Sequence, residues 1–182
     1  MIRDLPPLPV AMAGLVALAV VVAAGFAPWL ASSDPTLLSS LDLANAEIPP
    51  AWIEGGEARH PLGTDNQGRD LVSAILYGAR VSIAIGVASV LVSATLGVTL
   101  GLLAGYLGGW VDALVSRVGD VIMSFPTILL ALLVSGLARA LIPDAASATW
   151  TPLILVGAIA VHEWVQYART VRAATMVERA RD

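Results

Sequence analysis

The sequence contains few side chains whose types and spacing could support catalysis. The stretch His162-Glu163-Trp164-Val165-Gln166 begins like the zinc-binding helix of a metalloprotease, but Gln166 occupies the position that requires a second histidine. His60 is distant in the sequence, and neither histidine belongs to a carboxylate or cysteine cluster with metal-ligand spacing. The chain has no cysteine, no nucleophile elbow and no phosphate-binding loop motif. We therefore predict that it is not an enzyme and that it binds no metal.

The composition indicates that the elements around these residues lie in a membrane. Of the 182 residues, 57% are apolar and only 13% are charged, and the mean hydropathy is +0.81. Soluble domains usually carry a charged share of about 25%, and a single core could not bury this much apolar surface. These values exclude a disordered tail and an ordinary soluble enzyme. They also exclude a nucleic-acid binder with a basic face, since the net charge is -4.

Four apolar segments predict an all-α integral membrane protein, a bundle with transmembrane spans at residues 10–31, 81–107, 121–140 and 145–162. At about 1.5 Å per residue, the first segment covers a hydrocarbon core of roughly 30 Å. A cleaved signal peptide is the alternative, but its apolar run would be shorter, roughly 7–15 residues. We therefore favour an uncleaved anchor. The third segment contains Pro126, which lacks an amide donor and is expected to kink the helix.

The arginines that follow the last span predict the orientation of the chain. They are Arg169, Arg172, Arg179 and Arg181. Cytoplasmic segments carry an excess of basic residues, so this tail is expected in the cytoplasm. With four crossings the N-terminus, where Arg3 lies beside Asp4, is on the same side, and residues 32–80 face outward. The expected location is the cytoplasmic (inner) membrane, crossed several times.

Small residues recur at every fourth position of the second span. They are Ser89, Ser93, Gly97, Gly101 and Gly105. In lipid, such residues allow the backbones of two helices to approach closely. This face is therefore expected to pack against another helix. The contact is either ordinary bundle packing or a sliding surface that lines a translocation path.

A glycine pair follows the second span. Gly108 and Gly109 are expected to end the helix in a turn on the cytoplasmic side. Two acids, Asp112 and Asp120, follow this turn before the third apolar segment. Arg117 lies three residues before Asp120 and could pair with it on one helical face. A solvated turn at the membrane interface accounts for these residues.

Several short motifs occur in a recognisable order. The first is the stretch from His60 to Asp70, His-Pro-Leu-Gly-Thr-Asp-Asn-Gln-Gly-Arg-Asp. It is followed by Gly-Ala-Arg-Val-Ser at residues 78–82, Gly-Tyr-Leu-Gly-Gly-Trp-Val-Asp at 105–112 and Tyr-Ala-Arg-Thr-Val-Arg at 167–172. In this order the chain resembles the permease subunit of bacterial ABC importers for dipeptides, oligopeptides and nickel, the DppC/OppC-like family. The residues of the signature loop are His60, Gly63, Thr64, Asp65, Gly68, Arg69 and Asp70.

The resemblance implies a division of labour among subunits. Such permeases have six spans with a cytoplasmic N-terminus. They work with a second permease subunit, two ATPase subunits and an extracytoplasmic solute-binding protein. ATP is bound by the partner subunits, so this chain is expected to hold no cofactor. Its own partners would be those subunits and membrane lipid, without nucleic acid.

The resemblance also implies how the chain is organised. Residues 1–77 would form an N-terminal transmembrane helix with an extracytoplasmic loop, and residues 78–182 the N-terminal part of the permease domain. Arg169 and Arg172 would lie on the approach to the ATPase. The coupling motif of the family, Glu-Ala-Ala-x-x-x-Gly, is absent at the end of the chain, so a truncated permease is expected.

The function implied is a share of the translocation path for peptides across the cytoplasmic membrane. Nickel is the alternative cargo, and the residues of the spans do not distinguish the two. A non-transporting membrane scaffold, which would need no ATPase, is a second class of function. An intramembrane enzyme is disfavoured because no nucleophile and base share an apolar segment at suitable spacing.

The signature loop has two interpretations. Gly63 and Gly68 permit tight turns, and Asp65 or Asp70 could cap the start of the second span. In that case the loop is a self-contained, capped turn. Alternatively, Arg69 and Asp70 form an outside contact, and the loop is a docking edge for the solute-binding protein or the partner permease.

Overall fold

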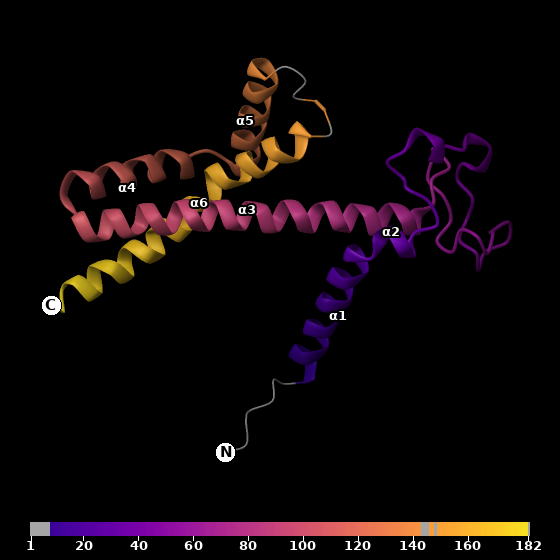
Figure 1. Cartoon of the computed structure of the whole chain (residues 1–182), viewed down its shortest axis with the longest axis horizontal. Coiled ribbons are helices and arrows are strands. Elements are labelled where there is room, and N and C mark those ends of the chain that lie inside the picture. Colours follow the sequence, from indigo (N-terminus) through magenta and orange to yellow (C-terminus); the bar gives the residue numbers. More distant parts are fainter. Residues whose placement is uncertain (1–7, 143–145, 148, 182) are drawn as a thin grey trace. The chain divides into compact units, whose positions relative to one another are not determined.

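The computed structural model describes residues 8–142, 146–147 and 149–181. In this part of the chain every regular element is a helix, and the one β-type pairing is an isolated antiparallel bridge between Thr64 and Asp70 (Figure 1). The elements are α1 (Leu8–Gly25), α2 (Ala27–Leu30), the short 3₁₀ helices η1 (Leu38–Ser40) and η2 (Leu43–Asn45), α3 (Leu71–Leu107), α4 (Gly109–Met123), α5 (Thr127–Leu141) and α6 (Trp150–Arg179). The predicted all-α class is therefore confirmed. The chain divides into two compact units, Met1–Ala84 and Ile85–Asp182.

The first apolar segment forms α1, an 18-residue helix long and apolar enough to cross a membrane. The helical path breaks at Phe26, and the single turn of α2 follows with a proline in its first turn. The rings of Phe26 and Trp29 lie 5.4 Å apart, and Trp29 is largely exposed. Aromatic side chains at the end of a membrane helix suit the boundary between lipid and water.

The second apolar segment forms part of α3, which has 37 residues and also qualifies as a span. The helix begins at Leu71, ten residues before the predicted start at residue 81. The first turn of α3 is capped by Asp70, whose carboxylate accepts from the amide of Ser73. Gly78 lies within the helix, and a Cβ atom there would meet no atom within 4 Å. At about 1.5 Å per residue the helix is roughly 55 Å long, well beyond the hydrocarbon thickness of a bilayer.

The third predicted span, residues 121–140, is interrupted by a sharp break, and it qualifies as a span only as part of a bent pair of helices. The helix α4 ends at Met123, α5 begins at Thr127, and their axes differ by 97°. Pro126 was expected to kink the span, and the break is complete. The amide of Ser124 still donates to the carbonyl of Asp120, and its hydroxyl donates to the same oxygen at 2.7 Å, which closes α4. Pro126 cannot continue the helical hydrogen bonding beyond that point.

The fourth predicted span, residues 145–162, differs most from the structure. Residue 145 lies outside the described residues, as do Arg3 and Asp4. The described helix α6 runs on to Arg179, and it is not among the helices that are long and apolar enough to cross a membrane. Polar residues in its middle, such as Glu163, lower its hydropathy. The described residues thus offer two spans, or three if the bent pair α4–α5 counts as one, instead of four.

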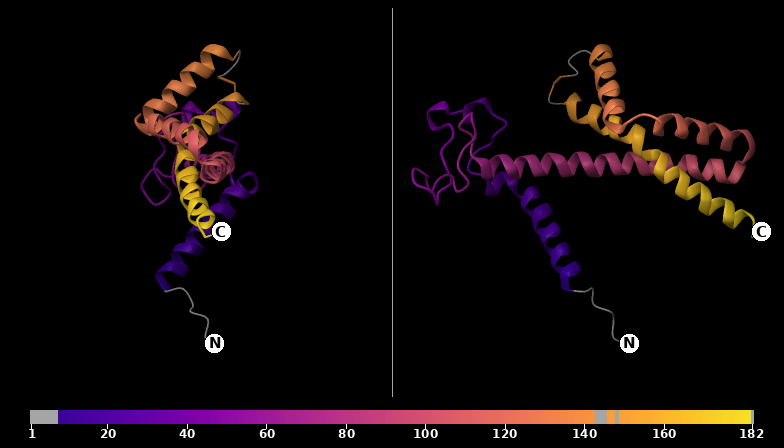
Figure 2. Two further views of the ribbon diagram at one scale, coloured as in Figure 1. Left: turned by 90° about the vertical axis from the view of Figure 1, so that its left-hand side faces the viewer. Right: turned by 180° about the vertical axis from the view of Figure 1, so that it is seen from behind.

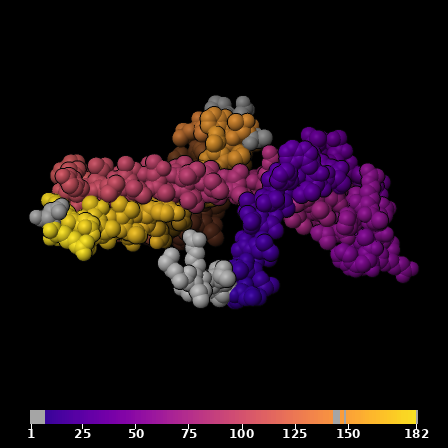
Figure 3. All heavy atoms as spheres, turned by 60° about the horizontal axis from the view of Figure 1, so that its bottom comes forward, coloured from indigo at the N-terminus to yellow at the C-terminus, as the bar shows by residue number. Residues whose placement is uncertain are grey.

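The core of the second unit lies around α6. Trp164, Val165 and Ala168 are buried there, and side chains of α3 and α4 pack against them: Leu100, Val115, Ile122 and Met123. Figures 2 and 3 show α6, in yellow, running alongside the later part of α3. Because α6 contacts both α3 and α4, it holds the helices of this unit together.

Candidate functional site

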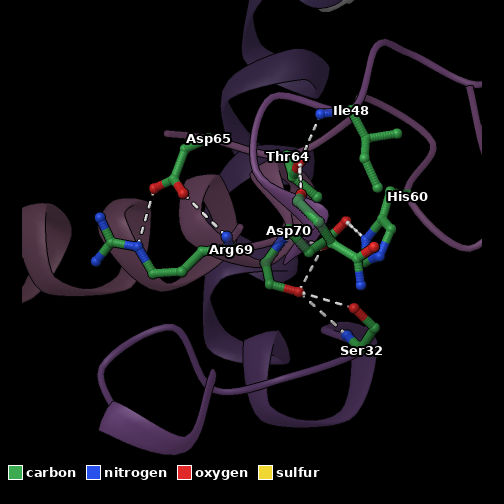
Figure 4. Close-up of polar contacts among 9 residues, drawn as sticks. Ser32, Ile48, His60, Thr64, Asp65, Arg69 and Asp70 are labelled. Carbon is green, nitrogen blue, oxygen red and sulfur yellow. Dashed lines mark hydrogen bonds and ion pairs between the residues drawn. The ribbon is translucent and has the colours of Figure 1, made fainter. Parts of the chain in front are cut away.

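The signature loop closes onto the start of α3 through a buried carboxylate (Figure 4). Asp70 is 3% exposed, and its Oδ2 accepts hydrogen bonds from the amide of Ser73 at 2.8 Å and from the Ser73 hydroxyl at 2.7 Å. Its Oδ1 lies 3.2 Å from Nδ1 of His60. Asp70 is therefore the N-cap of α3, as one of the two alternatives predicted, and the carboxylate is satisfied on both oxygens.

Ser73 extends this network to the segment that follows α2. Its side chain is fully buried, and its Oγ accepts from the amide of Ser32 at 3.2 Å and lies 3.2 Å from the Ser32 hydroxyl. These hydrogen bonds form a chain that runs from His60 through Asp70 and Ser73 to Ser32. Polar groups joined in this way fasten the exit of the first apolar segment to the start of α3, because breaking any link leaves a buried partner unsatisfied.

Thr64 and the two glycines of the loop set its backbone path. The Thr64 hydroxyl donates to the carbonyl of Asn45 at 2.6 Å and accepts from the amide of Ile48 at 2.9 Å. Gly63 and Gly68 have φ angles of 82° and 75°. A Cβ atom at Gly63 would overlap the carbonyl of Ile48, and one at Gly68 that of Asp42. Glycine is therefore required at both positions by conformation and by space.

Asp65 closes the turn between these glycines and does not cap α3. Its Oδ1 accepts from the amides of Gln67 at 2.8 Å and Arg69 at 2.9 Å, and its Oδ2 accepts from Nε of Arg69 at 2.9 Å. Arg69 is thus paired inside the loop. Asp70 is likewise engaged within the chain, so the self-contained turn has direct structural support, and the predicted outside contact stays a prediction.

The loop environment lowers the pKa values of two of its carboxyl groups, Asp65 and Asp70. Burial by itself raises the pKa of Asp70, but the hydrogen bonds from Ser73 and the neighbouring His60 hold this pKa below its ordinary value. In Asp65 desolvation also opposes ionisation, and the bonds from Arg69 and Gln67 outweigh it, so its pKa is lowered too. Both groups are therefore carboxylates at neutral pH, the form that the geometry requires.

The glycines of α3 meet α6 at very short range. A Cβ atom at Gly97 would lie 2.5 Å from the carbonyl oxygen of Trp164, and one at Gly101 would lie 2.6 Å from that of Ala168. At Gly105 the nearest atom would be Cβ of Thr175, at 2.7 Å. The three glycines of the small-residue face therefore lie where the backbones of α3 and α6 approach closely. The use of this face as the lining of a translocation path stays a prediction, because in this unit α6 covers it.

The two serines of the same face are satisfied within α3. Ser89 and Ser93 are buried, and each hydroxyl donates to the carbonyl four residues earlier, at 2.8 Å to Ile85 and 2.6 Å to Ser89. Both side chains therefore act as small, internally bonded groups that a neighbouring helix can approach.

The predicted turn between α3 and α4 is present. Gly108 and Gly109 have φ angles of 66° and 55°. Two consecutive residues in the left-handed region are accessible to glycine and costly for other residues. The pair reverses the chain so that α4 can return toward α6, whose Val165 lies close to Gly119 of α4.

Two ion pairs that span long sequence distances join α4 to α6. Arg172 donates through Nε to Oδ1 of Asp112 and through Nη2 to Oδ2 at 2.6 Å. Arg169 donates through Nη2 to Oδ1 of Asp120 at 2.8 Å. The predicted pairing of Asp120 with Arg117 is therefore replaced by one with α6. Arg169 and Arg172 were expected on the approach to the ATPase, and the structure engages both with α4.

A cavity of about 460 Å³ lies between these two helices. It is lined by Val115, Ser116, Gly119, Asp120, Trp164, Val165, Ala168, Arg169 and Arg172. Both arginines that line it are engaged in ion pairs, Arg169 with Asp120 and Arg172 with Asp112. Within the described residues, no group of three or more His, Cys, Asp or Glu side chains is placed to hold a metal ion.

Sequence reasoning missed the residues that connect segments distant in the chain. Ser32, Ser73 and the contact between Thr127 Oγ1 and His162 Nε2, at 3.0 Å, were not singled out. A signal existed for the ion pairs: α4 carries the acids Asp112 and Asp120, and α6 carries Arg169 and Arg172 directly after an apolar run. Such charges are costly unless they find partners.

Comparison with known proteins agrees with this architecture. Residues 97–182 match the family described as "binding-protein-dependent transport system inner membrane component". The chain is 41% identical over 166 residues to the di/tripeptide transport system permease protein DppC of Pseudomonas aeruginosa, covering 91% of this chain and 50% of the relative. It is 44% identical over 174 residues to the dipeptide transport system permease protein DppC of Escherichia coli, covering 94% and 53%. The chain thus spans about half the length of the curated relatives it matches.

These findings define the class first: the chain is an all-α, multi-pass protein of the inner membrane, and its second half is similar to a family of transporter permeases. Within that class its similarity is to the DppC-type permeases named above, in agreement with the resemblance carried by the signature loop and the later motifs.

Proposed function

We propose that this chain contributes to the translocation path of an ABC importer that carries peptides across the cytoplasmic membrane. The observation that carries the proposal is the continuous similarity to DppC permeases over 91% of the chain. The helices are consistent with this role, because α1 and α3 are long and apolar enough to cross a bilayer.

The proposal includes an orientation and a set of partners. The N-terminus and the end of α6 face the cytoplasm, and the signature loop faces outward, because the arginines are concentrated after the last apolar segment. The partners are a second permease subunit, ATPase subunits and an extracytoplasmic solute-binding protein. ATP binds to the ATPase subunits, and this chain needs no cofactor of its own.

The proposed division of the chain follows the same logic. Residues 1–77 supply the anchor and the outward loop, and residues 78–182 supply the first part of the permease domain. The ordered loop suits a docking edge, since its polar network fixes its shape in advance and reduces the entropy lost on binding. Arg169 and Arg172 stay candidates for the approach to the ATPase, through the helix that they position.

Peptide is favoured over nickel as cargo because the relatives named above are described as dipeptide or di/tripeptide permeases. The test is uptake of a radiolabelled dipeptide and of radiolabelled nickel in cells from which the gene is deleted and then restored. We expect dipeptide uptake to disappear on deletion and to return on restoration. Loss of nickel uptake alone would overturn the choice of cargo, and unchanged uptake of both would support a scaffold instead.

A further inference from the structure

The two sides of α6 are held by different kinds of contact. On one side α4 contributes the ion pairs Asp112–Arg172 and Asp120–Arg169, as described above. On the other side α3 contributes a row of glycines. This difference affects how α6 can move. Ion pairs resist a displacement of α6 relative to α4, whereas glycine packing forms no hydrogen bond that would resist its displacement relative to α3.

The α4 side is anchored at two separate levels. The pair of Arg172 with Asp112 is bidentate, and Ser116 donates to the same carboxylate at 3.3 Å. Its side chains are 33% and 18% exposed, so solvent screens it less than the Asp120–Arg169 pair, whose side chains are more than half exposed. A bidentate arginine–carboxylate pair fixes both distance and orientation. Val165 packs against Gly119, the residue before Asp120.

The α3 side is made of backbone and carbon atoms. A Cβ atom placed at Gly97, Gly101 or Gly105 would meet backbone atoms of α6 and the Cβ or methyl carbons of its side chains. The Thr175 hydroxyl at this contact donates to Val171 within α6 itself, at 2.8 Å. A displacement of α6 along this face therefore breaks no directional bond between these residues. Packed helices that slide in this way are one of the recurrent modes of conformational change.

The connection from α3 to α4 permits such a displacement. Gly108 and Gly109 both have positive φ angles and no side chain. Glycine tolerates a wide range of backbone angles, so this pair can absorb a change of angle between the two helices. At the other end, the contact of Thr127 with His162 joins the start of α5 to α6.

We infer that α4 and α6 move as one body along the glycine face of α3, turning at Gly108–Gly109, and that Asp112, Asp120, Arg169 and Arg172 are the positioning residues that lock this body. The inference rests on the proposed function, because it describes how the transporter changes state. It assigns to the two arginines a role inside the permease instead of a direct contact with the ATPase.

The test measures distances between spin labels in the assembled transporter. The chain has no cysteine, so a pair of cysteines can be introduced and labelled selectively in this chain. Labels at the exposed residues Leu114 and Met176 report the distance from α4 to α6, and labels at Leu103 and Met176 report that from α3 to α6. Between the nucleotide-free and ATP-bound states we expect the first distance to stay constant and the second to shift. A change in the first distance as large as that in the second would overturn the inference.

Variants separate positioning from general stability. Asp112→Asn is expected to lower transport roughly tenfold, the size expected for one charge-assisted contact, and to broaden the α4–α6 distance distribution. The exchanged pair Asp112→Arg with Arg172→Asp is expected to restore both. Glu178→Gln is the matched control, because Glu178 pairs with Arg181 within the end of the chain and is exposed. An exchanged pair that assembles normally but restores neither property contradicts the inference.

The distance measurements also separate this inference from the proposed function. If the wild-type transporter takes up no peptide and its distances do not respond to ATP, the proposed function fails. The effect of Asp112→Asn on the α4–α6 distribution is measured without nucleotide and does not depend on transport. An unchanged distribution in that variant overturns the lock even where transport is demonstrated.

Discussion

The signature loop and the packing of α6 against α3 and α4, called the α6 joint below, are stabilised by different kinds of contact. In the loop, the polar partners come from one continuous stretch of the chain, from Asp65 and Arg69 at 2.9 Å to Ser32 and Ser73 at 3.2 Å. In the joint, α6 meets residues that are far away in the sequence, through bare backbone on α3 and ion pairs on α4. The comparison teaches that the loop can be shaped by the single segment that contains it, whereas the contacts of α6 exist only after three helices have assembled.

The largest effect is expected from Gly101→Leu in the joint. A side chain there would meet the backbone of Ala168, which cannot rotate away, so α6 must be displaced. We expect a loss of about 3 kcal/mol or a failure to assemble, measured as thermal stability of the purified transporter in detergent. Gly86→Leu is the control on the same helix, since no atom lies within 4 Å of its Cβ position. Equal stability of the two variants would refute the close contact with α6.

Asp70→Ala is the corresponding change in the loop. It removes the N-cap of α3 and leaves His60 and the buried Ser73 without their partner. We expect a loss of about 2 kcal/mol in the local stability of the loop, seen as faster hydrogen exchange of residues 60–73.

Membrane insertion should be unchanged in this variant, whereas Asp70→Asn keeps a capping side chain and should have a smaller effect. If Asp70→Ala abolishes docking of the solute-binding protein while hydrogen exchange in the loop stays at the wild-type rate, the main role of Asp70 is in docking and not in capping α3.

Gly68→Ala tests whether the loop requires glycine at this position for lack of space as well as for its backbone conformation. Its φ of 75° disfavours alanine, and the added Cβ would overlap the carbonyl of Asp42. Gly55→Ala is matched in conformation, with a φ of 86°, but its Cβ would make only an ordinary van der Waals contact, at 3.7 Å from Pro49. We expect Gly68→Ala to cost about 1 kcal/mol more than Gly55→Ala by protease resistance of the loop. Equal costs would show that only conformation matters there.

The smallest effect is a dependence of loop stability on pH. The pKa of Asp70 is lowered in the folded loop, so its contribution is fully present above the ordinary carboxyl pKa of about 3.9. The contribution is lost as the pH falls through the lower folded value. Loop protection should therefore be flat from pH 7 to about pH 4 and decline below it. The decline should be weaker in Asp70→Asn, and identical profiles would remove Asp70 as its cause.

The same contrast explains what the sequence could predict. The capping aspartate, the turn glycines and the packing glycines of α3 follow from short-range rules of backbone geometry and helix periodicity. The break at Ser124-Phe125-Pro126 was anticipated only as a kink, because the bend of 97° depends on where α5 finds its contact with α6. The partners of Asp112 and Asp120 could not be predicted, since spacing along one helix does not reveal which distant helix lies opposite.

The most direct test of the central claim is the sidedness of the two regions. Single cysteines at Ala58, in the outer segment, and Val177, near the end of α6, are both at exposed positions in a chain that otherwise has none. With a membrane-impermeant maleimide on intact cells, an importer permease in the proposed orientation is labelled at residue 58, and at residue 177 only after the membrane is opened. Labelling of both positions from the same side would contradict the topology and the transport function built on it.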